Sequence, residues 1–107
     1  MCSSDLVTSP QRYPALPDVP TVAESGVPDF QVMSWYGLVY PAGTSRPIID
    51  KVNKGLHEVL AREEVRKQIT TLGANPQTST SEELRTHVAN EIAKWSAVRE
   101  KAGIPQQ

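Results

Sequence analysis

The sequence predicts an α/β fold in which a buried strand precedes three amphipathic helices. Residues 30–40 are mostly β-branched, aromatic or aliphatic on both alternating faces, a pattern typical of a strand covered on both sides. Between residues 48 and 98, apolar residues recur at three- and four-residue steps, as on helices with one apolar face. Residues 7–9 are predicted to be the end of a β-branched strand.

The composition is that of one ordinary globular unit, or part of one. The chain has 107 residues, of which 38% are hydrophobic and 21% charged, and its net charge is −1. Lys and Arg are scattered among acids, which argues against nucleic acid as a partner. Apolar runs fall far short of the roughly 20 residues that span a bilayer, so we expect no direct membrane insertion. No secretory signal follows Met1.

The N-terminal residues are expected to be foreign to the natural protein. Residues 1–6, MCSSDL, match neither strand nor helix periodicity, and the tail of a common sequencing adapter can encode them. We therefore predict a non-native leader at 1–6, with the natural protein beginning upstream of residue 7. A lone cysteine, Cys2, excludes an intrachain disulfide.

A proline-rich segment follows the strand stub. Five of the nine prolines lie in residues 10–28, where their fixed φ and missing N–H groups prevent a helix or central strand. We predict an extended, ordered loop. Within it, Thr21 and Glu24 have the spacing of a capping box that opens one short helical turn, and Gly26 ends that turn.

The predicted strand covers Phe30 to Tyr40, and residues 41–44 turn the chain out of the sheet. Thr44 or Ser45 then caps the first helix. The residues expected to face inward on this helix are Ile48, Val52, Leu56, Val59 and Leu60.

Two further helices complete the predicted fold. The second begins with Glu63 and Glu64 and ends at Gly73, and residues 74–79 are predicted to form a short edge strand. A second capping box, Thr80 with Glu83, begins the third helix, which ends at Gly103. The residues expected to face inward are Val65, Ile69 and Leu72 on the second helix and Leu84, Val88, Ile92, Trp95 and Val98 on the third.

The sequence offers no catalytic, cofactor or metal site. His57 and His87 lie on different predicted helices, and neither has a second strong ligand at helical spacing. Ser25 and Ser34 are not in a strand-to-helix nucleophile elbow. The paired glutamates occupy first helical turns, where negative charge is favoured for structural reasons. Trp95 is predicted to be a core residue, whereas Trp35 could line either a core or a cleft.

Several short motifs give the chain a resemblance to a known family. RYPALPDVPTVAESG spans residues 12–26, WYGLVYPAGT spans residues 35–44, and EVR, LG, KW and AGI follow at 64–66, 72–73, 94–95 and 102–104. In order and spacing these motifs resemble the Bug-type (TctC-like) extracytoplasmic solute-binding receptors, over roughly residues 7–104. Each motif alone is only weak support for the resemblance, whereas their shared order and spacing are specific to this family.

The resemblance implies a partial lobe of a type II periplasmic-binding-protein-like fold, in which two α/β lobes hinge shut over a ligand. Residues 7–107 would be the C-terminal part and would complete the first lobe, with 7–9 as hinge strand. The full-length parent would be periplasmic, would bind a small carboxylate and would deliver it to the membrane subunits of a tripartite tricarboxylate transporter. The resemblance implies that Ser34 and Trp35, on the strand facing the cleft, contact the ligand.

Two other functions remain open at the level of sequence. The chain could be a self-sufficient small α/β protein-interaction domain that pairs through its exposed strand. It could also be part of an enzyme whose catalytic residues precede residue 7. The receptor interpretation predicts no enzymatic activity and no cofactor, and it places the family's main ligand loops upstream of this chain.

Overall fold

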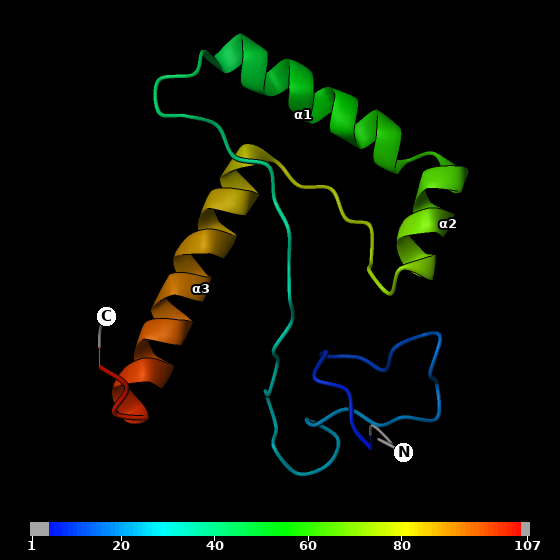
Figure 1. The fold of residues 1–107 in the computed structure, drawn as a ribbon, viewed down its shortest axis with the longest axis vertical. Helices are drawn as coiled ribbons and strands as arrows, with labels where there is room; N and C mark the ends of the chain where they lie inside the picture. The colour runs from blue at the N-terminus through cyan, green and yellow to red at the C-terminus, as the bar shows by residue number, and fades with distance from the viewer. Residues whose placement is uncertain (1–4, 106–107) are drawn as a thin grey trace. The chain divides into compact units, whose positions relative to one another are not determined.

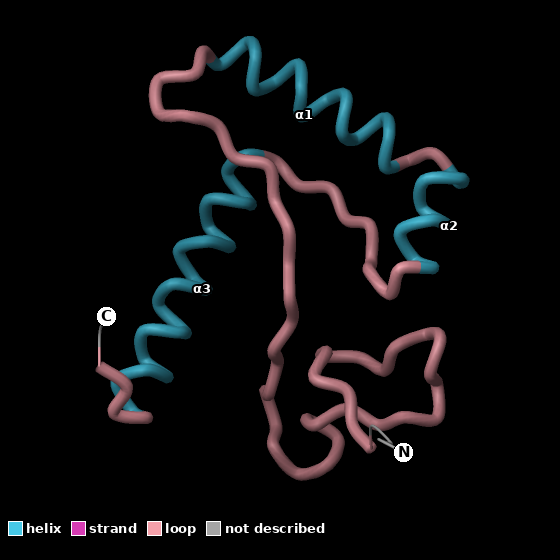
Figure 2. The backbone as a smooth tube through the Cα atoms, in the orientation of Figure 1, coloured by secondary structure: helices cyan, strands magenta, loops and turns pink. Residues whose placement is uncertain are grey.

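A computed structural model describes residues 5–105, and its regular structure is helical. Helix α1 spans Arg46–Leu60, α2 spans Glu63–Thr71 and α3 spans Ser81–Lys101 (Figure 1). Loops connect them, and no strand occurs among residues 5–105 (Figure 2). Most of the predicted leader, residues 1–4, lies outside the described residues. The chain divides into two units, Met1–Gly37 and Leu38–Gln107, which are described in turn.

The first unit is organised around Thr21, which is 1% exposed. Val7 forms an isolated parallel bridge with Thr21. Two backbone hydrogen bonds hold this bridge: the Val7 N–H donates to the Pro20 carbonyl at 2.9 Å, and the Val22 N–H donates to the Val7 carbonyl at 3.0 Å. The predicted strand at 7–9 is therefore reduced to this isolated bridge at Val7, and Thr8 adds one further backbone hydrogen bond, accepted by its carbonyl from the Val32 N–H.

The predicted capping box at Thr21 is confirmed. The Glu24 N–H donates to the Thr21 hydroxyl at 3.0 Å, and the Thr21 N–H donates to the Glu24 carboxylate at 2.9 Å. The Ser25 hydroxyl adds a hydrogen bond to the Thr21 carbonyl. Gly26, at φ 113°, adopts a backbone conformation that only glycine takes without strain, and there the turn ends. The box therefore closes a single turn.

Arg12 clamps the same turn from across the proline-rich loop. Its Nε lies 3.1 Å from both carboxylate oxygens of Glu24, and its Nη1 donates to the Pro17 carbonyl at 3.2 Å. The Arg12 guanidinium, followed by the Thr21 backbone N–H, lowers the pKa of Glu24 from 4.5 to about 2. Both side chains are 46% exposed, so water screens the pair and weakens it relative to a buried one.

In the second unit, the helix limits match the prediction within a few residues. Ser45 is the N-cap of α1, although its side chain makes no capping hydrogen bond, and Pro47 lies in the first turn. Helix α2 begins with Glu63 and Glu64, and Gly73, at φ 82°, follows its end.

Helix α3 begins with the second predicted capping box. The Thr80 hydroxyl accepts from the Glu83 N–H at 3.1 Å, and the Glu83 carboxylate accepts from the Thr80 N–H at 2.7 Å. The Thr80 backbone and side chain lower the pKa of Glu83. Just before the box, the Asn53 amide donates to the Ser79 carbonyl at 2.9 Å, and His57 Nε2 lies 3.2 Å from the same oxygen. These contacts tether the start of α3 to α1.

The prediction that the helices bury their apolar faces is wrong for this structure. None of the helices contains a buried residue. Trp95 was predicted to be a core residue, but 44% of its surface is exposed. Its indole N–H donates to the Glu91 carboxylate at 2.9 Å, and Lys94 Nζ lies 5.3 Å from the centroid of its ring. Amphipathic periodicity predicts which face is apolar, whereas burial also requires a second surface, and the described residues cover these faces only in part: Leu56, Leu60 and Val88, for example, are half-buried.

The two remaining predicted strands are also corrected. Residues 30–40 and 74–79 run without strand pairing in the described structure (Figure 2). A strand needs a neighbour for its backbone N–H and C=O groups, and the pattern of its own side chains cannot provide one.

The lowered pKa of Glu24 predicts an acid-sensitive first unit. Because the folded-state pKa lies below 4.5, this carboxylate contributes full stability above pH 4.5, and its contribution is lost as the pH falls toward about 2. An NMR titration of the Glu24 carboxyl group should give a midpoint well below 4.5. The exposed-helix variant Glu58→Gln should leave this midpoint unchanged. A midpoint at the ordinary value would show that the clamp does not form.

The capping box of α3 predicts a specific loss of stability. Thr80→Ala should lower the free energy of unfolding of this helix by about 1 kcal/mol, since the Glu83 N–H loses its acceptor. Urea denaturation followed by far-UV circular dichroism measures the change. Thr86→Ala, on the same helix, is the matched control and should not destabilise, because alanine favours helix. An equal decrease in the free energy of unfolding in Thr80→Ala and Thr86→Ala would rule out a capping effect.

Candidate functional site

The candidate site lies on an extended segment that leaves the Thr21 turn. Asp29 has a positive φ of 63° at the bend after Pro28, and the Phe30 N–H donates to the Val27 carbonyl at 3.3 Å. The Val32 N–H then donates to the Thr8 carbonyl at 3.0 Å, which aligns the start of the segment beside the chain's first described residues. The direction of the segment is therefore set two residues before Ser34.

Ser34 and Trp35, the residues predicted to contact a ligand, follow each other directly on this segment. Both are exposed in the structure, and 42% of the Trp35 surface is accessible. They offer a hydroxyl group and a large aromatic face, which are suited to an oxygen-rich ligand with an aliphatic part. The two residues are adjacent because they are consecutive in the sequence, and their contact with a ligand stays a prediction.

The residues after Trp35 are apolar and strongly exposed. Tyr36 has 93% of its surface accessible, and in the second unit Leu38 and Val39 have 56% and 81%. A run of large apolar side chains in water is unusual for a folded surface, and it commonly marks an interface.

The charged groups with shifted pKa values have structural roles. The Arg12 guanidinium and then the Thr21 backbone N–H lower the pKa of Glu24, and the Thr80 backbone N–H and hydroxyl lower the pKa of Glu83, because each stabilises the charged carboxylate. Within the described part of the chain, no group of three or more His, Cys, Asp or Glu side chains could hold a metal ion. Likewise, no described helix is long and apolar enough to cross a membrane.

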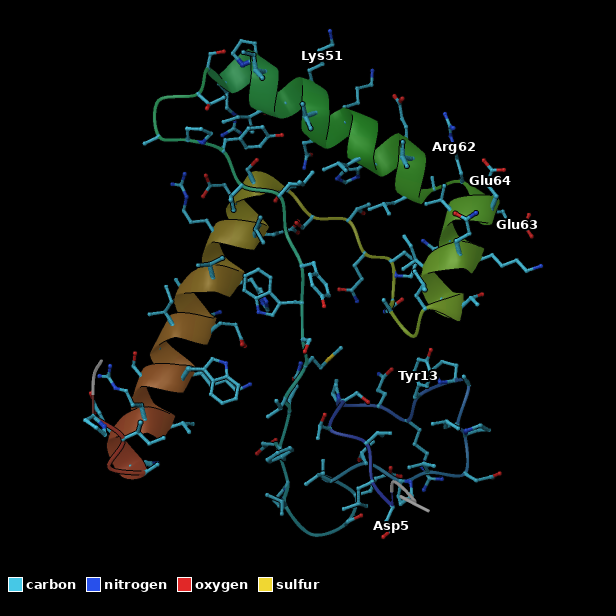
Figure 3. All side chains as sticks on the ribbon, in the orientation of Figure 1. Asp5, Tyr13, Lys51, Arg62, Glu63 and Glu64 are labelled. Atoms are coloured by element: carbon cyan, nitrogen blue, oxygen red, sulfur yellow. The ribbon has the colours of Figure 1, made fainter. Side chains whose placement is uncertain are left out.

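A shallow hollow at the junction of α1 and α2 was not predicted from the sequence. It is lined by Arg62, Glu63, Glu64 and Lys67, and Figure 3 shows the first three of these side chains around the turn between the helices. The lining mixes two cations with two anions and is widely open to solvent, so it selects for neither sign of charge. It has the features of a solvated helix junction.

The family comparison agrees with the motifs of the sequence. The family described as "Tripartite tricarboxylate transporter family receptor" (TctC) matches residues 5–104, which is nearly the whole chain. Among curated relatives, the UPF0065 protein in the clcB-clcD intergenic region of Pseudomonas knackmussii is 39% identical over 90 residues, covering 83% of this chain and 53% of the relative. Protein BugT of Bordetella pertussis is 33% identical, covering 91% of this chain and 30% of BugT.

Two solved structures are similar in fold as well as sequence. The periplasmic binding protein BugD matches with a TM-score of 0.81 and 36% identity, over 94% of this chain and 34% of BugD. The R. palustris protein Rpa4515, solved with adipate, matches with a TM-score of 0.80 and 33% identity, over 92% of this chain and 33% of Rpa4515. The chain thus spans about half the length of one curated relative and about a third of the two solved structures.

These matches identify the fold class that the sequence predicted. The loops and helices described above, which contain no strand of their own, correspond to a partial α/β lobe of a periplasmic binding protein. Over residues 5–104, this chain belongs to the tripartite tricarboxylate transporter receptor (TctC) family, and it is similar to the Bug-type proteins BugT and BugD.

Proposed function

We propose that residues 7–107 are the C-terminal part of an extracytoplasmic solute-binding receptor and complete the first of its two α/β lobes. The receptor captures a small carboxylate in the periplasm and delivers it to the membrane subunits of a tripartite tricarboxylate transporter. The family match supports this function. It is also supported by the structural similarity to a periplasmic binding protein and to a protein solved with adipate. We propose a binding protein rather than an enzyme because the matched family is one of receptors.

One structural observation carries the proposal that this chain works within a larger receptor. Residues 30–40 are apolar on both faces, yet the structure leaves Tyr36 and Val39 almost fully exposed. Burying apolar surface contributes about 25 cal/mol per Å², so a cover over this segment would be strongly stabilising. The proposed cover is the remainder of the lobe, whose strands and helices would flank the segment on both edges and both faces.

The chemistry proposed for binding requires no catalytic group. A carboxylate can be held by backbone N–H groups, hydroxyls and bridging waters, provided that enough donors converge on it. Ser34 would donate its hydroxyl hydrogen to a ligand oxygen, and Trp35 would cover the ligand's carbon chain with its ring. Other donors would come from upstream loops of the receptor.

The gene provides the first test. The nucleotide sequence immediately upstream of the Val7 codon should continue the reading frame through about two hundred further residues and a signal peptide, in keeping with a family of exported two-lobe receptors. A true start codon and ribosome-binding site before Met1 would instead support a stand-alone interaction domain. A nucleophile or metal motif upstream would support an enzyme.

Ligand binding should depend on the complete receptor. Isothermal titration with adipate, and with a panel of di- and tricarboxylates, should give saturable binding by the full-length receptor. The 107-residue chain alone should bind none of them, and it should aggregate at high concentration because its apolar surface is uncovered. Tight, saturable binding by the isolated chain would contradict this account of the fragment.

The proposed contacts predict which variants lose affinity. In the full-length receptor, Ser34→Ala should weaken carboxylate binding about tenfold, the usual effect of removing a hydrogen bond to a charged group. Trp35→Ala should weaken it further than Trp35→Phe, which keeps an aromatic face. The matched control is Ser96→Ala on α3, which should leave the dissociation constant unchanged. Unaltered affinity in both Ser34→Ala and Trp35→Ala would exclude these residues from the site.

A further inference from the structure

Hydrogen bonds and the short pieces of backbone between them link Arg12 to the segment that carries Ser34 and Trp35. Arg12 binds both carboxylate oxygens of Glu24 at 3.1 Å, and this carboxylate accepts the Thr21 N–H at 2.9 Å. Thr21 is bridged to Val7. The next residue along from Val7, Thr8, accepts the Val32 N–H at 3.0 Å through its carbonyl. All of these contacts lie within the first unit.

We propose that Arg12 and Glu24 are positioning residues, which hold the Thr21 turn so that the Val7–Thr8 backbone orients Ser34 and Trp35 toward the ligand. Neither charged side chain needs to touch the ligand. Their effect passes through the buried Thr21 and the single hydrogen bond at Val32, which precedes Ser34 by two residues. The effect of Arg12 and Glu24 on Trp35 does not depend on the proposed receptor function. Only the contact between Trp35 and the ligand rests on that function.

The geometry of the clamp requires arginine in particular. Its Nε faces both oxygens of Glu24 and its Nη2 lies 3.1 Å from one of them, while its Nη1 is occupied by the Pro17 carbonyl. A planar guanidinium can make these contacts at the same time, whereas the ammonium of lysine is a compact point charge. Arg12 therefore fixes the proline-rich loop and the capping turn together, and Arg12→Lys should keep only the ion pair.

The local test uses Trp35 as a reporter in the chain itself. The chain has two tryptophans, so Trp95→Phe leaves Trp35 as the single tryptophan. In this background, Arg12→Ala should lower the fluorescence anisotropy of Trp35 toward the value of the chain unfolded in urea, and Arg12→Lys should give an intermediate value. The matched control is Arg46→Ala, which removes a surface ion pair of 2.9 Å on α1 and should leave the anisotropy unchanged.

A second measurement covers the case in which Arg12→Ala disrupts more than the clamp. Far-UV circular dichroism should show the same helix content in Arg12→Ala and in its parent, since the helices belong to the other unit. Glu24→Gln keeps an oxygen that can accept the Thr21 N–H but removes the ion pair, so it should speed hydrogen exchange at the Val32 amide without changing the helix signal. Unchanged Trp35 anisotropy in Arg12→Ala, or unchanged exchange at Val32 in Glu24→Gln, would overturn the positioning role.

The final step is measured in the full-length receptor with adipate as the probe. Arg12→Ala should weaken binding, Arg12→Lys should restore part of the loss, and Arg46→Ala should have no effect. If the receptor binds no carboxylate but Trp35 still responds to Arg12, the positioning role stands and the proposed function fails. If it binds adipate with equal affinity in all variants, the function stands and the positioning role fails.

Discussion

An extended apolar segment needs hydrogen-bonding neighbours on its edges and cover on its faces, and this requirement governs the structure. Residues 30–40 have the composition of a fully buried strand, but in the described chain they are anchored at Val32 and then run exposed. The apolar faces of the helices are also incompletely covered, since no helix contains a fully buried residue. Among residues 5–105, each unit has local order, but no apolar side chain is buried. A chain that spans about a third of the two similar solved structures is expected to have such uncovered apolar faces.

Order in the first unit has a different origin. There, the proline-rich loop is held by polar contacts around the buried Thr21, with the Glu24 carboxylate as the shared acceptor of Arg12 and the Thr21 N–H. Such a cluster can form without a large apolar core, because each of its hydrogen bonds connects residues that a short loop brings together. The Val32–Thr8 hydrogen bond connects this cluster to the start of the segment that carries the candidate site.

Local signals were sufficient to predict the helices and both capping turns. The hydroxyl of Thr80 and the carboxylate of Glu83 lie three residues apart, and Gly73 directly follows Leu72, the C-cap of α2, so no distant segment is needed to define these ends. The strands at 30–40 and 74–79 and the burial of Trp95 could not be predicted in the same way, because each depends on a partner surface. The Arg12–Glu24 clamp was missed because its partners are separated by twelve residues of loop. Their opposite charges at the two ends of the proline-rich segment were the only available signal. Ser34 and Trp35 remain predictions taken from the family resemblance.

Hydrogen exchange of the backbone amides in residues 36–40 tests the central claim most directly. If this segment is a strand that the rest of the receptor completes, its amides should exchange at nearly the rate of an unfolded peptide in the 107-residue chain, and they should be strongly protected in the full-length receptor. Strong protection in the isolated chain at low concentration would contradict the claim, because it would show that the chain supplies its own strand neighbours. Rapid exchange in the full-length receptor would contradict it equally.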